Sequence, residues 1–288
     1  MDLNDHPCFS AKCQPRTGRI HLPVAPRCNI FCRFCARGLS SGADLPGNAA
    51  RILSPGEAAG IVEAALALCP EIRVAGVAGP GDPLAGPESL EALRLVRERH
   101  PGIITCLSTN GLNLYDSMEG LMAAGVQTVT VTVNAVDPKI LAMLNRGVVV
   151  GGGFAGGLEG ARILASAQER GIREAARNSM TVKVNTVLVP GINLGQVGEL
   201  ASEVKGWGCE IMNLIPVIPA HDLKHVSAPT PDEYVSASDA AARHLPVKSN
   251  CRRCRADACG VPGLSDFSEA LYGVPGGASW NQETFSHG

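Results

Sequence analysis

Strand-like and helix-like segments alternate along this chain from about residue 20 to about residue 220. The strand candidates are short apolar or alternating stretches, and they cover residues 20–26, 73–78, 103–107, 129–133, 181–188 and 211–217. Ser54-Pro55-Gly56-Glu57 has the form of a capping box with proline at the first helical position, which predicts a helix start. Roughly six β/α units in series favour a parallel sheet with helical crossovers, so we predict an α/β fold. Residues 151–153, three glycines, are expected to be flexible.

Polar or glycine-rich loops follow several of these strands. They comprise a three-cysteine loop after residues 20–26, GPGDP at 79–83, STNG at 108–111, and the residues Asn134 and Asn185. In parallel α/β folds the functional loops lie at the C-terminal ends of the strands. We therefore expect these loops to meet at one mouth of the sheet.

Composition narrows the class of protein. The chain has 288 residues, 45% of them hydrophobic, and a formal net charge of −2, so nothing marks it as a nucleic-acid binder. No apolar run reaches the ~18 residues of a membrane span, and the N-terminal segment lacks the apolar region of a secretory signal. Eleven cysteines, an odd number, indicate metal or redox chemistry in a reducing compartment rather than a disulfide framework. Cys69 and Cys209 are expected to be ordinary buried cysteines.

The three-cysteine loop carries the most specific signal. Cys28, Cys32 and Cys35 have the spacing C-x3-C-x2-C directly after a predicted strand. Three thiolates on a four-iron cubane leave one iron open for direct binding of a substrate or cofactor. A structural zinc ion would need a fourth ligand near by. The alternatives are a zinc site or a plain redox loop.

This loop, with Phe34 before its last cysteine, the glycine-rich turn after the second predicted strand and the serial β/α pattern, resembles the radical S-adenosylmethionine (SAM) superfamily. The resemblance implies a TIM-like partial (βα)6 barrel with cysteine-containing N- and C-terminal extensions. It also implies that the open iron of a 4Fe–4S cluster chelates SAM, which is cleaved to methionine and a 5′-deoxyadenosyl radical.

Further stretches are similar to the NifB family, over roughly residues 6 to 260. They are HPCFS at 6–10, HLPVAPRCNI at 21–30, AGPGDPLA at 78–85, LSTNG at 107–111, VTVTVNAVDP at 129–138, VKVNTVLVPGIN at 182–193 and CRRCRADA at 251–258. The resemblance implies an enzyme of the lyase or transferase type in nitrogenase cofactor biosynthesis. That enzyme fuses two 4Fe–4S units, with a SAM-derived carbide and a sulfur, into an eight-iron precursor. The chain is expected to lack the C-terminal carrier domain of some members.

The same resemblance implies ligands for one or two auxiliary 4Fe–4S clusters. These are Cys8, His21, Cys106, Cys251 and Cys254, where Cys251 and Cys254 form a C-x2-C chelate. For His21 and Cys106 the alternative is a satisfied core histidine and a buried core cysteine. For the C-x2-C pair the alternative is a zinc knuckle or a redox pair.

The candidates for contact with SAM lie near the same mouth; they are Phe34, Gly79, Gly81, Asp82, Asn110 and Asn185. The glycines would let the backbone approach the amino-acid part of SAM, where side chains would obstruct it. Glycine and asparagine are also ordinary turn residues, which is the alternative.

One departure from the family pattern concerns the loop that follows Cys35. Ser41 stands where family members carry a further cysteine, and Asp44 is the acidic residue nearest to the family's glutamate. A hydroxyl is a much poorer iron ligand than a thiolate, so Cys13 or Cys259 could substitute. We assign catalytic roles to Asp44 and Cys254. A divergent radical SAM enzyme with one auxiliary cluster, acting on a peptide or small molecule, and a non-enzymatic iron–sulfur scaffold remain alternatives.

These expectations define three regions and a cellular setting. The regions are an N-terminal extension over 1–19, the barrel over 20–246 and a cysteine-rich tail over 247–288 that folds over the barrel mouth. The expected partners are iron–sulfur cluster donors, a cofactor carrier protein and a low-potential electron donor, with no nucleic acid or membrane. The expected location is the cytoplasm.

Overall fold

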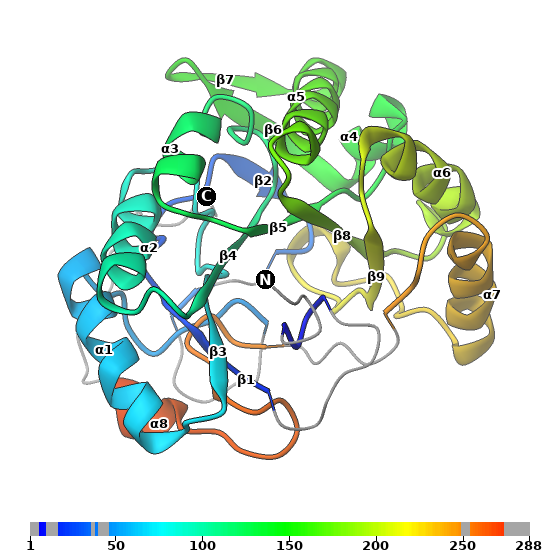
Figure 1. The fold of residues 1–288 in the computed structure, drawn as a ribbon. Coiled ribbons are helices and arrows are strands. Elements are labelled where there is room, and N and C mark those ends of the chain that lie inside the picture. Colours follow the sequence, from blue (N-terminus) through cyan, green and yellow to red (C-terminus); the bar gives the residue numbers. More distant parts are fainter. Residues whose placement is uncertain (1–5, 10–16, 36–37, 40–45, 249–253, 274–288) are drawn as a thin grey trace.

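A seven-stranded sheet forms the centre of the molecule in the computed structural model, which describes residues 6–9, 17–35, 38–39, 46–248 and 254–273 (Figure 1). The order β10-β1-β3-β4-β5-β8-β9 comprises β1 Gly18–His21, β3 Ile72–Val77, β4 Ile104–Thr109, β5 Thr128–Thr132, β8 Thr181–Leu188, β9 Ile211–Pro216 and β10 Cys259–Gly260. The first six of these strands in chain order pair in parallel, and β10 is antiparallel to β1. The predicted α/β partial barrel is confirmed.

Helices cover the outer face of the sheet (Figure 1). They are α1 Pro55–Leu68, α2 Glu88–Arg99, α3 Met118–Ala123, α4 Pro138–Leu144, α5 Gly157–Arg177, α6 Val197–Trp207, α7 Pro231–Ala242 and α8 Ser268–Tyr272, with 3-10 turns at Leu194–Gln196 and His221–Leu223. The predicted capping box is present, because the Ser54 side chain accepts a hydrogen bond from the Glu57 N–H and Glu57 bonds back to Ser54. None of the helices that the structure describes is long and apolar enough to cross a membrane.

The alternation of residues along each strand separates two environments. In β5 and β8 the valines Val129, Val131, Val182 and Val184 are fully buried in the main hydrophobic core under the helices. Successive side chains on a strand point to opposite faces. Thr130 and Lys183 therefore point to the concave side of the sheet, where they line a cavity.

A second, antiparallel sheet contains β2 Ile30–Cys32, β6 Asn145–Val150 and β7 Gly153–Gly156. At the predicted glycine stretch 151–153, Gly151 and Gly152 form the two-residue turn of the β6/β7 hairpin. Their φ angles are +59° and +78°, which suits a primed hairpin turn and favours glycine at both positions. This sheet holds the cysteine loop, because β2 lies within it.

The C-terminal segment 254–273 folds back along the first strand of the barrel. β10 pairs with β1, with Ile20 opposite Cys259, and the Tyr272 hydroxyl donates to the His21 carbonyl at 2.6 Å. Cys69 and Cys209 are buried in the main core, as predicted. The segment closes the β1 edge of the sheet and brings Cys254 to the concave side.

Candidate functional site

The three cysteines of the loop line one cavity. Cys28, Cys32 and Cys35 are partly exposed, and none of them belongs to the buried core. Together with Phe34 they face a cavity of about 110 Å³, which we call the loop cavity. The Arg33 N–H donates to the Leu144 carbonyl and fixes the loop to the end of α4, and the Cys35 N–H donates to the Cys32 carbonyl within the loop.

Asp222 binds Arg33, which lies in the cysteine loop between Cys32 and Cys35. Its carboxylate accepts from Arg33 at 2.9 Å and from Arg146 at 2.6 and 2.8 Å, and its N–H donates to the Arg33 carbonyl. The hydrogen bond from Arg146 is the main cause that lowers the pKa of Asp222 to about 2. The carboxylate is therefore ionised at neutral pH, and the loop is fixed to β6.

The glycine-rich turn at 79–83 is joined to the segment that precedes Cys28. The Gly81 N–H donates to the Ala25 carbonyl and the Asp82 N–H to the Arg27 carbonyl, both at 2.7 Å. A Cβ at Gly81 would collide with the Arg27 carbonyl oxygen. Gly79, with φ of +134°, packs against Gly47 and Ala256. At these glycines two protein segments approach each other closely, and the contact of the turn with SAM stays a prediction.

Asp82 and Asn110 form the next layer of this support. The buried carboxylate of Asp82 accepts from the Thr109 hydroxyl, the Asn110 N–H and the Leu84 N–H at 2.6–3.0 Å. The Asn110 amide donates to Asn29 at 2.6 Å and lies 4.0 Å from Cys28 Sγ. Both side chains line the loop cavity, but their hydrogen bonds hold two strand-end turns against the cysteine loop.

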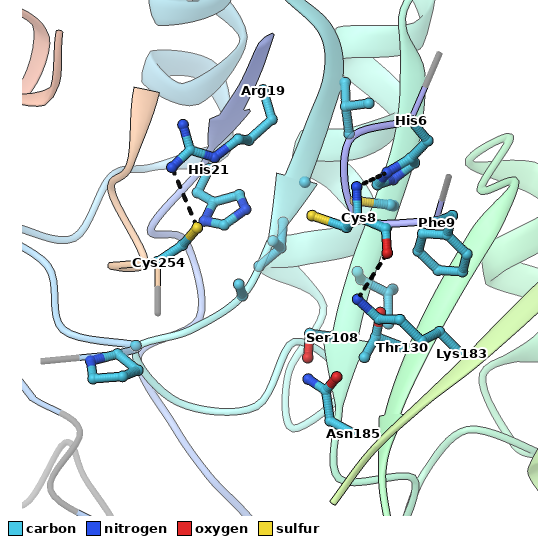
Figure 2. Close-up of a pocket in the computed structure, with 18 of the residues that line it drawn as sticks. His6, Cys8, Phe9, Arg19, His21, Ser108, Thr130, Lys183, Asn185 and Cys254 are labelled. Carbon is cyan, nitrogen blue, oxygen red and sulfur yellow. Dashed lines mark hydrogen bonds between the residues drawn. The ribbon is translucent and has the colours of Figure 1, made fainter. Parts of the chain in front are cut away.

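A second and larger cavity, of about 170 Å³, lies on the concave side of the sheet (Figure 2). We call it the barrel cavity; its lining includes Cys8, His21, Cys106 and Cys254, the described members of the predicted auxiliary ligand set. In Figure 2 Cys254 and His21 lie on one side and Cys8 on the other. Four residues from distant parts of the chain are thus brought to one cavity.

Strand register explains the placement of two of these residues. His21 on β1 lies opposite Gly76 on β3, which in turn lies opposite Cys106 on β4. An added Cβ at Gly76 would lie 2.5 Å from Cys106 Sγ and 3.8 Å from His21 Cδ2. The glycine therefore leaves the space that Cys106 Sγ occupies between the flanking strands. Burial raises the pKa of Cys106 to about 12, which favours the neutral thiol.

His21 has the protonation state that a metal ligand requires. Its Nδ1 lies 2.8 Å from the Arg255 carbonyl, which can only accept, so Nδ1 carries the proton. Burial is the main cause that lowers the pKa of His21 to about 4, followed by the charge of Arg19. A neutral imidazole held at Nδ1 by a backbone carbonyl presents Nε2 as a lone-pair donor.

Cys254 enters through the C-terminal segment. Its carbonyl accepts from the Gly47 N–H, and its Sγ accepts from Arg19 Nη2 at 3.3 Å. Cys259, which we suggested as a substitute ligand, is fully buried in the apolar core opposite Ile20. That suggestion was wrong, because Cys259 lies on the core side of β10, away from the cavity. Burial raises the pKa of this thiol to about 12.

The two cavities share part of their walls. Ser108 on β4, Asn185 on β8 and Ile215 on β9 line both of them. Asn185 accepts from the Asn213 side chain at 3.0 Å. The predicted clustering of strand-end residues at one mouth is therefore present in the geometry, and these residues form the boundary between the cavities.

Four residues named above lie outside the described part of the chain: Cys13, Ser41, Asp44 and Cys251. Their assignments stay predictions. Three polar residues of the barrel cavity, His6, Arg19 and Lys183, were missed from the sequence as site residues. For Lys183 the signal was a polar residue at an alternate position of an otherwise apolar strand, Val182-Lys183-Val184, whereas His6 lies outside the strands and had no such signal.

The residues of the loop cavity fit a cubane with one open iron. Its described lining contains three cysteines, no histidine and one carboxylate, Asp82, which is already engaged. Among the described residues no group of three or more His, Cys, Asp or Glu side chains could hold one metal ion. The three cysteines need not converge on one metal ion, because a cubane binds each thiolate at a different iron.

Comparisons with known proteins agree with this geometry. The family model described as the radical SAM superfamily matches residues 22–204. FeMo cofactor biosynthesis protein NifB of Methanocaldococcus jannaschii is 42% identical over 258 residues, which cover 89% of this chain and 86% of that protein. The protein of the same name from Chlorobaculum tepidum is 38% identical, over 94% of this chain and 65% of that protein. A radical SAM methyltransferase from Sphaerobacter thermophilus shares the fold, with a TM-score of 0.53, 20% identity, and coverage of 80% of this chain and 64% of that chain.

Proposed function

The chain belongs to the NifB family of radical SAM enzymes, and from this membership we propose that it assembles a precursor of the nitrogenase cofactor. In this reaction two 4Fe–4S units, a carbon derived from SAM and a sulfur are combined into an eight-iron carbide core. The observation that most supports the proposal is the shared wall of Ser108, Asn185 and Ile215. On one side of this wall lies the cavity that we assign to the SAM-binding cubane. On the other side lies the cavity that we assign to the auxiliary clusters, which we call cargo clusters because the reaction combines them.

In the loop cavity, we assign Cys28, Cys32 and Cys35 as the ligands of three of the four irons of the resident cluster. When bound, the cluster and SAM supply reductive cleavage of the sulfonium and the carbon that is transferred. Asn110 lies 4.0 Å from Cys28 Sγ and orients that ligand through Asn29. Asp82 orients the turn at 79–83, whose backbone, including Gly79 and Gly81, faces SAM. This division makes Asp82 and Asn110 positioning residues.

Phe34 and Asn185 are the remaining assignments for contact with SAM. Phe34 lines the loop cavity between Cys32 and Cys35 and packs against an apolar cluster. Asn185 lines both cavities. We therefore assign its amide a contact with the part of SAM that faces the barrel cavity.

In the barrel cavity, we assign Cys8, His21, Cys106 and Cys254 as ligands of the two 4Fe–4S cargo clusters. His21 contributes a neutral imidazole, and the thiols lose their protons as the iron binds, because iron binds the thiolate. Cys254 acts on the cargo during assembly. Cys251 and Asp44 complete the proposed set, as a further cargo ligand and a catalytic carboxylate.

The partners follow from the same chemistry. Cargo clusters must be delivered and the product removed, which calls for iron–sulfur donors and a carrier protein. SAM cleavage needs an electron donor of low potential. An open iron is readily oxidised, so the setting is a reducing, anaerobic cytoplasm.

The test is iron and EPR quantitation on protein reconstituted anaerobically, together with SAM cleavage assays on two variants. We expect about twelve irons in the wild-type protein, with one EPR signal shifted by SAM and the others unchanged. Cys32→Ala should abolish SAM cleavage. Cys254→Ala should retain cleavage and lose product formation.

Two outcomes would contradict the proposal. About four to eight irons in the wild-type protein would indicate a divergent radical SAM enzyme instead of NifB-like assembly. Loss of SAM cleavage in Cys254→Ala would contradict the division of labour between the cavities. Cys69→Ala serves as a matched control, because Cys69 is buried in the core away from both cavities.

A further inference from the structure

Two cationic side chains are buried in the wall of the barrel cavity. Arg19 is 7% exposed and Lys183 is 4% exposed, and both line this cavity. Buried charges are normally paired, because removing an isolated charge from water is unfavourable. Within the described residues neither forms an ion pair, and the cavity lining there contains no aspartate or glutamate. The wall therefore carries positive charge without a protein counter-charge at contact distance.

Several hydrogen-bond donors in the same wall also lack acceptors. Arg19 Nε and His6 Nε2 are buried and have no hydrogen-bond partner among the described residues. His6 Nδ1 accepts from the Cys8 N–H at 3.1 Å, so the ring of a neutral His6 carries its proton on Nε2. Buried donors of this kind normally find partners, so these two indicate a bound group.

Lys183 is the least satisfied of the three side chains. Its ammonium is 3.4 Å from the Cys8 carbonyl, a long hydrogen bond, and 5.0 Å from the centre of the Phe9 ring. An ammonium has three donors, so at least one remains for another acceptor. Figure 2 shows Lys183 extending toward the main chain of Cys8, while Arg19 reaches Cys254 on the opposite side of the cavity.

The ligands that we propose for the barrel cavity indicate which acceptor these hydrogen-bond donors would bind. A cubane held by thiolates carries net negative charge, and reduction makes that charge more negative. Its sulfides and thiolate sulfurs accept hydrogen bonds, and such bonds and nearby charges set the reduction potential. Arg19 already donates to Cys254 Sγ, which is one of the proposed ligands.

We infer that His6, Arg19 and Lys183 form a donor wall that binds the anionic cargo cluster, and that Lys183 is the residue that most raises its reduction potential. This inference rests on the proposed function, and it adds that the barrel cavity recognises its cargo by negative charge. The wall favours a thiolate-ligated cluster over a cationic metal ion, because two buried cations repel the latter. Lys183 is a positioning residue here, because its role is electrostatic.

The test is an EPR-monitored redox titration of the full chain, reconstituted with ferrous iron and sulfide. In Lys183→Met the ratio of reduced to oxidised cargo cluster at a fixed potential should fall about tenfold, which is ~59 mV for a one-electron couple. The SAM-sensitive signal should keep its potential. Lys183→Arg should stay close to the wild-type protein, and Lys205→Met, on the exposed face of α6, is the matched control.

The outcomes separate this inference from the proposed function. Four irons in the wild-type protein would overturn both. A wild-type protein with its full iron, together with an unshifted and fully occupied cargo cluster in Lys183→Met, would overturn the donor wall alone. Loss of the cargo cluster in Lys183→Met, with the SAM-sensitive signal kept and Lys183→Arg normal, would support it. If Lys183→Met fails to fold, Arg19→Gln is judged by the same criteria.

Discussion

At the residue scale, Gly76 limits the space available to Cys106. A Cβ on Gly76 would lie 2.5 Å from Cys106 Sγ, which is shorter than any normal contact. We expect Gly76→Ala to destabilise the protein by about 1–3 kcal/mol through overpacking and to displace the thiol. Iron analysis should show the loss of about one cubane, with the SAM-sensitive EPR signal retained.

Gly60→Ala is the matched control for this substitution. Gly60 lies in α1, and nothing lies within 4 Å of the position that a methyl group would take there. We expect this variant to gain about 0.4–1 kcal/mol in the free energy of unfolding and to bind full iron. A Gly76→Ala variant that also binds full iron would show that Cys106 is not a cargo ligand.

The residues of the site differ in how far the sequence predicts them. Cysteine spacing and the family resemblance predicted Cys28, Cys32 and Cys35, and the structure brings their thiols to one cavity. An aspartate in a glycine-rich turn, such as Asp82, can contact either a ligand or a neighbouring loop. The local sequence pattern is the same for both. That is why the hydrogen bonds of Asp82 to neighbouring turns were not foreseen. Lys183 was missed because a lysine in a strand is equally typical of a solvent-facing edge.

At the element scale, Asp257 joins a buried ion pair of the C-terminal segment to the backbone of Ala50. The Asp257 side chain is 2% exposed; it accepts from Arg255 Nε at 2.8 Å and from the Ala50 N–H at 2.6 Å. Removing one member of a buried pair leaves the other charge without its partner. We expect Asp257→Ala to lower the free energy of unfolding by about 3–5 kcal/mol, measured by urea denaturation of the metal-free protein.

Glu98→Ala removes an exposed pair of the same chemistry and is the control. Glu98 pairs with Arg94 on α2, where both side chains are about half exposed. Its expected effect is below about 1 kcal/mol. Equal effects of Asp257→Ala and Glu98→Ala would mean that the contacts of Asp257 with Arg255 and Ala50 do not stabilise segment 254–273.

Elements with local signals were the ones predicted well. The strand over Thr181–Leu188 and the capped start of α1 match the structure, because alternation and capping are encoded within a few residues. The β6/β7 hairpin was missed, since β6 also pairs with β2, more than a hundred residues earlier in the chain. A short apolar run does not show which distant strand it will join.

At the scale of the whole molecule, the two cavities share the wall of Ser108, Asn185 and Ile215, and the proposed function requires a reactive group to pass across it. Serial β/α patterning predicted that strand ends would meet at one mouth, but the shared wall depends on how far the sheet curves, which the sequence does not state. A small displacement between reacting groups is enough to reduce the rate by about 100-fold. The wall is therefore the place where the coupling of the two sites can be tested.

Ser108→Val adds bulk at this wall without adding charge. Ser108 lies on β4 opposite Thr130 and is partly exposed to both cavities. We expect the variant to bind SAM, shown by the SAM-induced EPR shift, and to cleave it. Product formed per SAM cleaved should fall at least about tenfold, because the reacting groups are held apart. Ser108→Ala, which adds no bulk, should keep the wild-type ratio. A wild-type ratio in Ser108→Val would mean that the reactive group reaches the cargo by another route, and the cavities would then be neighbours without being coupled at Ser108.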